Sequence, residues 1–293
     1  MKPKLYMIIS MLIFGSIGLL VRGIPLSSAQ IAMVRGVIGS SFLIIAAIAL
    51  KKKPSLKGVK RNLIYLLISG GALGFNWILL FEAYRYTTIT NATLSYYFAP
   101  VIVVLISPFI LKERLTFKKL LCILAAMIGM FLVAWTGGDN IALDNGLVGI
   151  GFGLGAAVLY ATVVILNKLI KEMGGMEVTI IQLTIASIVL IPYVLSQGAV
   201  PWKVLDTKAV ILLILVGLLN TGLAYLLYFS SVQKLESQTV AILSYIDPIS
   251  AVIMSAIFIG EELNALQLLG GALILGGALI STREKNYKPS SSS

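Results

Sequence analysis

The sequence predicts an all-α integral membrane protein with ten transmembrane helices, built as two inverted five-helix repeats. Three observations support this prediction: a shortage of charge, apolar stretches of regular length, and an internal repeat. Of the 293 residues, 58% are hydrophobic and only 12% are charged, whereas soluble domains carry about one quarter charged residues. The apolar stretches run for about twenty residues, which is what a helix needs to cross about 30 Å of hydrocarbon. Strands of a transmembrane barrel would instead alternate in polarity over about ten residues.

The ten helices are separated by short loops that hold most of the charge. In the first half we expect helices at Leu5–Val21, Ala29–Leu50, Asn62–Ala83, Thr90–Leu111 and Thr116–Trp135. In the second half we expect them at Gly146–Asn167, Val178–Gln197, Ala209–Ser231, Ser237–Gly260 and Leu263–Ser281. The first stretch follows Lys2 and Lys4, as the apolar part of a signal peptide does. We expect it to remain as the first helix, because the repeat needs it.

The distribution of Lys and Arg predicts the orientation, since cytoplasmic loops are rich in these residues. With the N-terminus inside, eighteen of the 23 Lys and Arg residues fall on the inner side. Four fall outside, and Arg35 lies within the second helix. We therefore expect both termini in the cytoplasm and the chain in the cytoplasmic (inner or plasma) membrane.

The repeat becomes visible when the first half is shifted by 148 positions. The superposed pairs are Tyr97 and Tyr245, Pro100 and Pro248, and Glu113 and Glu261; with small gaps, Arg22 pairs with Lys168. We expect the first repeat over 1–140 and the second over 146–285, followed by a C-terminal tail over 286–293. Each repeat holds an odd number of helices, so the two repeats must enter the membrane in opposite directions.

Two segments resemble a known family. They are Tyr97 to Pro100 running on to Lys112-Glu113-Arg114-Leu115-Thr116, and Leu243 to Pro248 running on to Gly260-Glu261-Glu262-Leu263. With five plus five helices and an arginine in the second, the chain resembles EamA-type members of the drug/metabolite transporter superfamily over essentially its whole length. The resemblance implies a ten-helix basket around a central cavity, lined chiefly by helices one, three, four, six, eight and nine. It also implies an exporter of an amino acid, an aromatic compound, a sugar or another metabolite.

Asp247 is the sharpest candidate for function. It lies ten residues into the ninth predicted helix, about 15 Å from the inner end and close to the bilayer midplane. An aspartate there costs about 3 kcal/mol on insertion scales, so it should face a cavity or a partner. It is a candidate to receive the amine of a substrate or a coupling proton. The alternative is a structural acid that pairs with Arg35 or caps backbone groups freed by Pro248. Its counterpart in the first repeat is Ala99, so the site is asymmetric.

Aromatic and polar side chains recur near the same depth and form the predicted substrate site. Tyr and Trp combine apolar faces with polar edges, which suits an organic solute better than a bare ion. Packing or interfacial positions are the alternative for each of them. The candidate substrate-binding residues are Asp247, Tyr245, Tyr97, Asn76, Trp77, Asn220, Tyr225, Tyr160 and Ser95.

Pro100, Pro248 and Arg35 are candidates for structural or gating roles. Each proline removes a backbone hydrogen bond and bends its helix, and bends at matching positions of two repeats point to a transport site. Arg35 lies about 9 Å from the outer end of the second helix. Its candidate roles are carboxylate binding, pairing with the midspan aspartate, and snorkelling outward. We expect Glu113 and Glu261, at loop–helix junctions, to cap the helices that follow them.

The composition narrows the function. The chain has no histidine and a single cysteine, Cys122, so we expect no metal, no cofactor and no enzymatic activity. The residues behind the net charge of +11 lie mostly in the loops, where they set the orientation of the chain in the membrane. We therefore expect no nucleic-acid partner. The prediction is a secondary transporter that exports an amino acid or related amine-bearing solute by alternating access, as a monomer or weak homodimer in membrane lipid. A channel or a non-transporting membrane sensor is the alternative, and a membrane enzyme is disfavoured.

Overall fold

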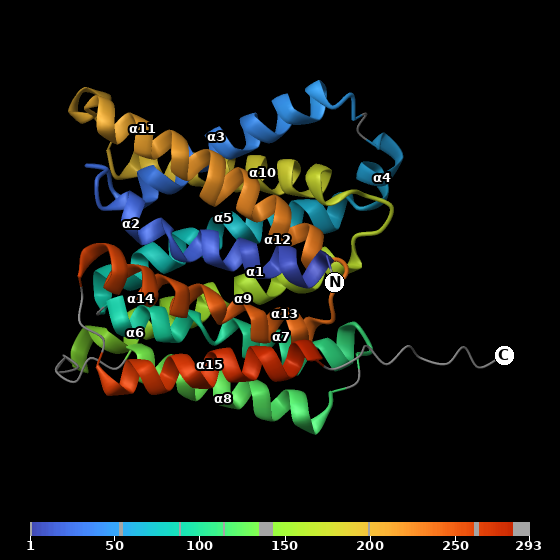
Figure 1. Ribbon diagram of the computed structural model, residues 1–293. Helices are drawn as coiled ribbons and strands as arrows, with labels where there is room; N and C mark the ends of the chain where they lie inside the picture. Colours follow the sequence, from blue (N-terminus) through green and yellow to red (C-terminus); the bar gives the residue numbers. More distant parts are fainter. Residues whose placement is uncertain are drawn as a thin grey trace.

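A computed structural model describes residues 2–52, 55–87, 89–113, 115–134, 143–198, 200–260 and 264–283 (Figure 1). Every regular element in these ranges is a helix, and the long helices run side by side through the molecule. The predicted all-helical fold class is therefore confirmed.

Eight helical segments of the described part are long and apolar enough to cross a membrane. They are Lys2–Val21, Ser28–Ala49, Leu63–Tyr86, Asn91–Ile110, Gly146–Leu169, Gly175–Ser196, Thr207–Val232 and Ser237–Phe258. A further apolar helix, Ala265–Ile280, is shorter. The chain is thus a multi-pass membrane protein.

The elements of the first half follow the five ranges predicted there to within three residues, and α4 is an additional helix. They are α1 (Lys2–Gly15), α2 (Ile17–Val21), α3 (Ser28–Ala49), α4 (Leu56–Arg61), α5 (Leu63–Tyr86), α6 (Ile89–Tyr96), α7 (Ala99–Ile110) and α8 (Phe117–Ala134). The predicted end of the fifth helix, Trp135, lies outside the described residues.

The second half continues with α9 (Leu143–Leu169), α10 (Gly175–Ser196), a 3-10 turn at Trp202–Val204 and α11 (Thr207–Leu215). A π-helical segment, η2 (Val216–Leu223), joins α11 to α12 (Ala224–Val232). The chain ends with α13 (Ser237–Ser244), α14 (Ile246–Ile259) and α15 (Ala265–Arg283).

Several helices that the sequence predicts as continuous are interrupted. The first is broken at Ser16, the fourth at Tyr97 and the ninth at Tyr245, and the eighth contains η2. Pro100 and Pro248 stand in the first turns of α7 and α14. Proline fits there because its missing N–H needs no partner in a first turn. The predicted bends are therefore breaks that precede the prolines, since neither ring nitrogen can donate to the carbonyl four residues earlier.

The helices pack in a bundle whose core is apolar. α5 lies against α9 and α10, α3 against α10 and η2, and α1 against α12 and α14. α8 packs against α15, and the two form one outer layer of the bundle (Figure 1). Fully buried side chains of the core include Leu43, Leu73, Leu183 and Tyr228.

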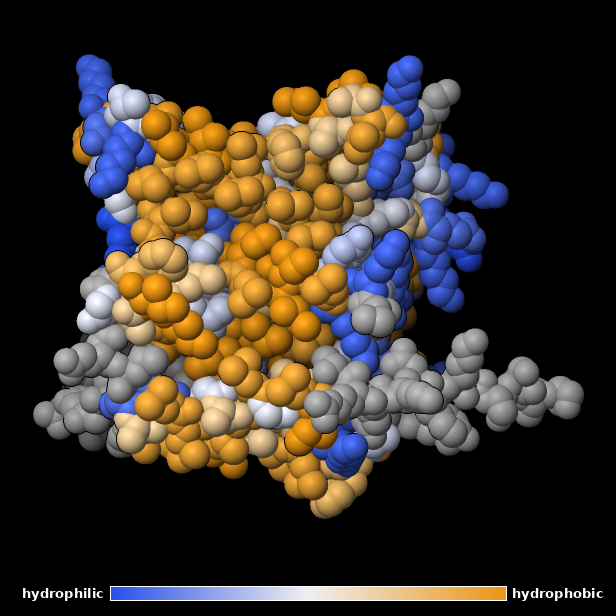
Figure 2. Space-filling view, in the orientation of Figure 1, coloured by the Kyte–Doolittle hydropathy of each residue, from blue (hydrophilic) through white to orange (hydrophobic). Residues whose placement is uncertain are grey.

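The surface matches a bilayer in its distribution of polarity. Figure 2 shows a broad hydrophobic face between two ends where hydrophilic residues gather. Large apolar side chains on this surface are strongly exposed, for example Phe109 at 86% and Ile48 at 71%. Such exposure would be costly in water and is favourable against lipid tails. The start of α1 and the end of α15 lie at the same end of the bundle (Figure 1).

Candidate functional site

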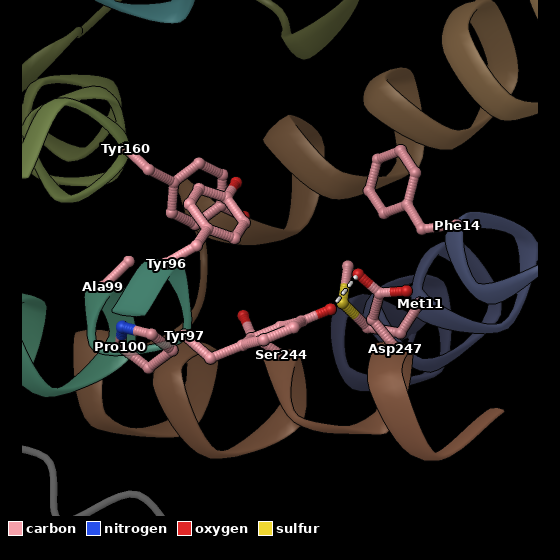
Figure 3. A pocket seen from close by; sticks show the side chains of 9 residues that line it. All are labelled: Met11, Phe14, Tyr96, Tyr97, Ala99, Pro100, Tyr160, Ser244 and Asp247. Carbon is pink, nitrogen blue, oxygen red and sulfur yellow. Dashed lines mark hydrogen bonds between the residues drawn. The ribbon is translucent and has the colours of Figure 1, made fainter. Parts of the chain in front are cut away.

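A small cavity opens at the level where the helices are broken. The space between its lining atoms, including the part open to solvent, is about 320 Å³. The lining residues, shown in Figure 3, are Met11, Phe14, Tyr96, Tyr97, Ala99, Pro100, Tyr160, Ser244 and Asp247. They come from α1, α9 and the two broken helices α6–α7 and α13–α14. Three of the predicted substrate-binding residues, Asp247, Tyr97 and Tyr160, therefore meet in one cavity.

Asp247 is the only acidic residue among the lining side chains, and a tyrosine holds it. The Tyr97 hydroxyl donates to Asp247 Oδ2 at 3.2 Å, drawn as a dashed line in Figure 3. The Tyr245 hydroxyl donates to the Tyr97 backbone carbonyl at 3.0 Å and so ties the two helix breaks together. Ser250 donates to the Asp247 carbonyl at 2.8 Å. One carboxylate oxygen thus receives a hydrogen bond, while the group faces the cavity.

Aromatic rings form the other side of the cavity. Tyr96 and Tyr160 meet edge to face with ring centroids 5.7 Å apart, and Figure 3 shows both rings facing the cavity. The Tyr160 hydroxyl hydrogen-bonds that of Tyr228 at 2.5 Å. Phe14 packs against Tyr228 with centroids 6.1 Å apart. A cation in this cavity would meet a carboxylate on one side and the negative faces of aromatic rings on the other.

In the repeat predicted from the sequence, six of the nine lining residues form three pairs. The shift of 148 positions superposes Tyr96 on Ser244 and Ala99 on Asp247, and the pairing of Arg22 with Lys168 places Phe14 on Tyr160. Phe14 and Met11 were not predicted from the sequence, because an apolar residue in an apolar helix carries no signal of its own. The repeat partner of Tyr160 is the signal that could have identified Phe14.

Arg35, Trp77 and Tyr225 form a second layer beside the cavity. The guanidinium carbon of Arg35 lies 4.8 Å from the centroid of the Trp77 ring. Trp77 and Tyr225 are 4% and 7% exposed, and their rings lie 6.1 Å apart. Tyr225 in turn contacts Phe14, with centroids 4.9 Å apart. No ion pair joins Arg35 to Asp247 in the described part of the chain, so the pairing that the sequence left open is not formed in this conformation.

Three predicted site residues are engaged elsewhere. Asn76 is fully buried and donates to the Ala156 carbonyl at 2.6 Å. Asn220 is fully buried and donates to the Ile13 carbonyl and, at 3.1 Å, to Ser16 Oγ, which secures the break between α1 and α2. Ser95 donates to the carbonyl four residues earlier at 2.7 Å. None of them lines the cavity, and neither does Tyr245, which is fully buried.

A network of charges joins the two halves at the end of α9. Glu113 Oε1 lies 2.8 Å from Lys168 Nζ, and Glu113 Oε2 accepts from the backbone N–H of Ser237 at 2.8 Å. Lys119 pairs with Glu236 in the same region. Both lysine side chains are only 10% exposed, so these pairs are shielded from solvent.

The network corrects the role predicted for Glu113. The sequence predicts that it caps the helix after it, whereas it binds the first N–H of α13 in the other half. Free N–H groups and the helix dipole make any helix N-terminus attractive to a carboxylate, so nearness in the fold decides which helix is capped. The prediction for Glu261 lies outside the described residues.

Comparisons with known proteins agree on a family. The model of the EamA-like transporter family matches residues 1–135 and 147–283. The uncharacterized transporter YxxF of Bacillus subtilis (strain 168) is 30% identical over 96% of this chain and 90% of its own length. An uncharacterized transporter of Archaeoglobus fulgidus is 27% identical over 94% of this chain and 95% of its own length. A protein crystal structure shares the fold, with a TM-score of 0.83 at 18% identity, covering 96% of this chain and 97% of that one.

Proposed function

The chain belongs to the EamA-like transporter family, and from this premise we propose that it is a secondary transporter that exports a small amine-bearing metabolite, such as an amino acid, across the cytoplasmic membrane. The family and the relatives named as transporters point to a membrane transporter rather than an enzyme. Export is the direction that the family resemblance implies. Transport proceeds by alternating access between two inverted repeats.

The observation that supports an amine-bearing solute is the carboxylate of Asp247 in an aromatic cavity. Its partner in the described part of the chain is the neutral hydroxyl of Tyr97, so the charge remains available to a cation. Tyr96, Tyr160 and Phe14 supply ring surfaces around it. Aromatic rings and a carboxylate together form a site for an organic ammonium group.

The contacts between helices support two inverted repeats of five crossings each. α3 packs on η2 as α10 packs on α5, and α1 packs on α14 as α9 packs on α7. Asn76 of α5 binds a carbonyl of α9, and Asn220 of η2 binds a carbonyl of α1. These pairs of contacts are the ones that a pseudo-two-fold axis between the repeats would relate. In this proposal α8 and α15 complete the ten crossings.

The charge network supports alternating access. Lys168 and Glu113 belong to different proposed repeats, so their ion pair closes the cavity toward the basic side of the protein. Movement of one repeat against the other would have to break this pair. We therefore propose that the present conformation is closed toward the cytoplasm.

Reconstitution tests the proposed function. In proteoliposomes, radiolabelled amino acids and short amines are expected to exchange across the membrane with saturable kinetics, because a bound solute must move with the conformational change. A channel would instead give a flux that rises linearly with concentration. Protein-free liposomes are the control. Absence of saturable exchange for every amine-bearing solute would contradict the proposal.

Orientation gives a separate prediction. In a Cys122→Ser background, a membrane-impermeant maleimide should label Lys203→Cys in intact cells, because the loop between α10 and α11 carries few basic residues and is expected outside. Lys57→Cys in α4, within the most basic loop, should be labelled only after permeabilisation. Both positions are exposed, so access to the reagent is limited by the membrane alone. The reverse pattern would overturn the proposed topology.

A further inference from the structure

Like Asp247, Arg35 is a charged residue within a membrane-spanning helix close to the cavity. It lies within α3, with apolar residues on either side in the sequence, and is partly buried. A charged side chain within a membrane-spanning helix is costly to insert. A functional reason for keeping it is therefore expected.

The N–H groups of the Arg35 guanidinium make no hydrogen bond in the described part of the chain. Its ring contact with Trp77 offers electrostatic attraction but uses none of its five N–H groups. Within the described part of the chain no hydrogen bond or ion pair engages Arg35. Its guanidinium nitrogens are not enclosed by protein atoms. These donors therefore face accessible space. A planar guanidinium with free donors binds a carboxylate through two parallel hydrogen bonds.

Arg35 and Asp247 act on the same two tyrosines. Tyr96, which lines the cavity, and Tyr225 each lie within electrostatic range of both charges. The contacts from Trp77 to Tyr225 and from Tyr225 to Phe14 connect the guanidinium to the cavity wall. The guanidinium of Arg35 and the carboxylate of Asp247 therefore share the same aromatic neighbours.

We propose that Arg35 is the carboxylate-binding group of the transport site and that the substrate is a zwitterion, whose ammonium group binds Asp247 and whose carboxylate binds Arg35. This inference rests on the proposed function and extends it, because it requires an anion in addition to the amine. Trp77 and Tyr225 are positioning residues: Trp77 holds the guanidinium plane, and Tyr225 holds Trp77. Binding the second charge also offsets the cost of keeping Arg35 within the membrane.

Matched probes test the proposal on the purified full-length protein in detergent. The panel contains α-amino acids and longer ω-amino acids, each accompanied by the amine that lacks its carboxylate and by the acid that lacks its amine. For wild-type protein, at least one zwitterion is expected to bind ten or more times more tightly than its amine. In Arg35→Gln this ratio should fall to about one, because the amine has no carboxylate for Arg35 to bind. Arg35→Lys should restore part of the ratio because it keeps the charge.

The outcomes separate this inference from the proposed function. Amines that bind through Asp247 with no advantage for any zwitterion in wild-type protein would overturn the role of Arg35 and leave the proposed function standing. Loss of amine and zwitterion affinity to the same extent in Arg35→Gln would also overturn it. If neither zwitterions nor amines bind wild-type protein, the proposed substrate class fails as well. Melting curves show whether each variant folds; if Arg35→Gln does not, the wild-type ratio and Arg35→Lys decide.

Discussion

Asp247→Asn is expected to weaken the binding of amine-bearing solutes strongly while the protein remains folded. Asparagine keeps the size of the side chain and an oxygen that accepts from Tyr97, at present 3.2 Å away, but it deletes the charge. A buried contact between opposite charges is worth about 2–5 kcal/mol when one partner is removed, and each 1.4 kcal/mol is a factor of ten. Affinity should therefore fall at least about thirtyfold. Isothermal titration in detergent measures the change.

The control is the same substitution at an acidic residue outside the cavity. Asp206 Oδ1 accepts from the backbone N–H of Ala209 at 2.7 Å at the start of α11, and Asn is an equally good N-cap. Asp206→Asn should leave both melting temperature and affinity unchanged. Melting of Asp247→Asn should be equal to or above wild type, because a charge leaves a region where it is costly. Unchanged affinity of Asp247→Asn would refute the role of this carboxylate.

The pH dependence of amine affinity provides a second test of the Asp247 carboxyl group. Protons and ammonium groups compete for one carboxylate, so affinity should weaken as pH falls and the carboxyl becomes protonated. Among the residues that the structure describes, the titratable side chains within electrostatic range of Asp247 are tyrosines: Tyr84, Tyr96, Tyr97 and Tyr225. They stay neutral over the acidic range, so the acid limb of the pH profile belongs to Asp247. This limb should disappear in Asp247→Asn.

Gly15→Ala is expected to have the second largest effect. A β-carbon at Gly15 would lie 1.9 Å from Ser250 Oγ, 2.8 Å from the Asp247 carbonyl oxygen and 2.9 Å from the Ala251 nitrogen. The serine hydroxyl can rotate away, but the other two atoms are backbone, so α1 must move away from α14. Overpacking of this kind costs about 1–3 kcal/mol. It also shifts Asp247 relative to the cavity, so affinity for amines should fall together with the melting temperature.

Gly18→Ala is the matched control, because a β-carbon at Gly18 meets nothing within 4 Å. Both glycines lie in the first membrane span, so general effects of the substitution on that span are the same. Gly18→Ala should leave stability and affinity at wild-type values or slightly raise stability, since alanine has less backbone freedom to lose. Equal melting temperatures for Gly15→Ala and wild type would show that the α1–α14 contact is not as tight as described.

The sequence by itself determined the all-helical class, eight of the ten predicted membrane spans and the resemblance to a transporter family. These properties depend on the hydrophobicity along the chain and on local motifs. An apolar segment of sufficient length is stable as a helix in a bilayer almost independently of its neighbours. The sequence also predicted that Asp247 faces a cavity, because an acidic residue within a membrane span is costly unless it faces a cavity or a partner. The predicted repeat pairs Tyr97 with Tyr245 and Pro100 with Pro248, and these residues lie at the two helix breaks that border the cavity.

Only the tertiary structure decided which of the candidate polar residues face the cavity. Asn76, Asn220 and Ser95 had the residue types of a binding site, yet their donors bind backbone carbonyls. A buried polar group gains as much from a carbonyl as from a solute, and the sequence does not tell which acceptor lies within reach. Phe14 and Met11 were invisible for the opposite reason, because their helix is apolar on every side. Arg35 lies over Trp77 instead of beside Asp247 because of the way α3 and α5 pack. The distance between two helices cannot be read from the sequence of either helix alone.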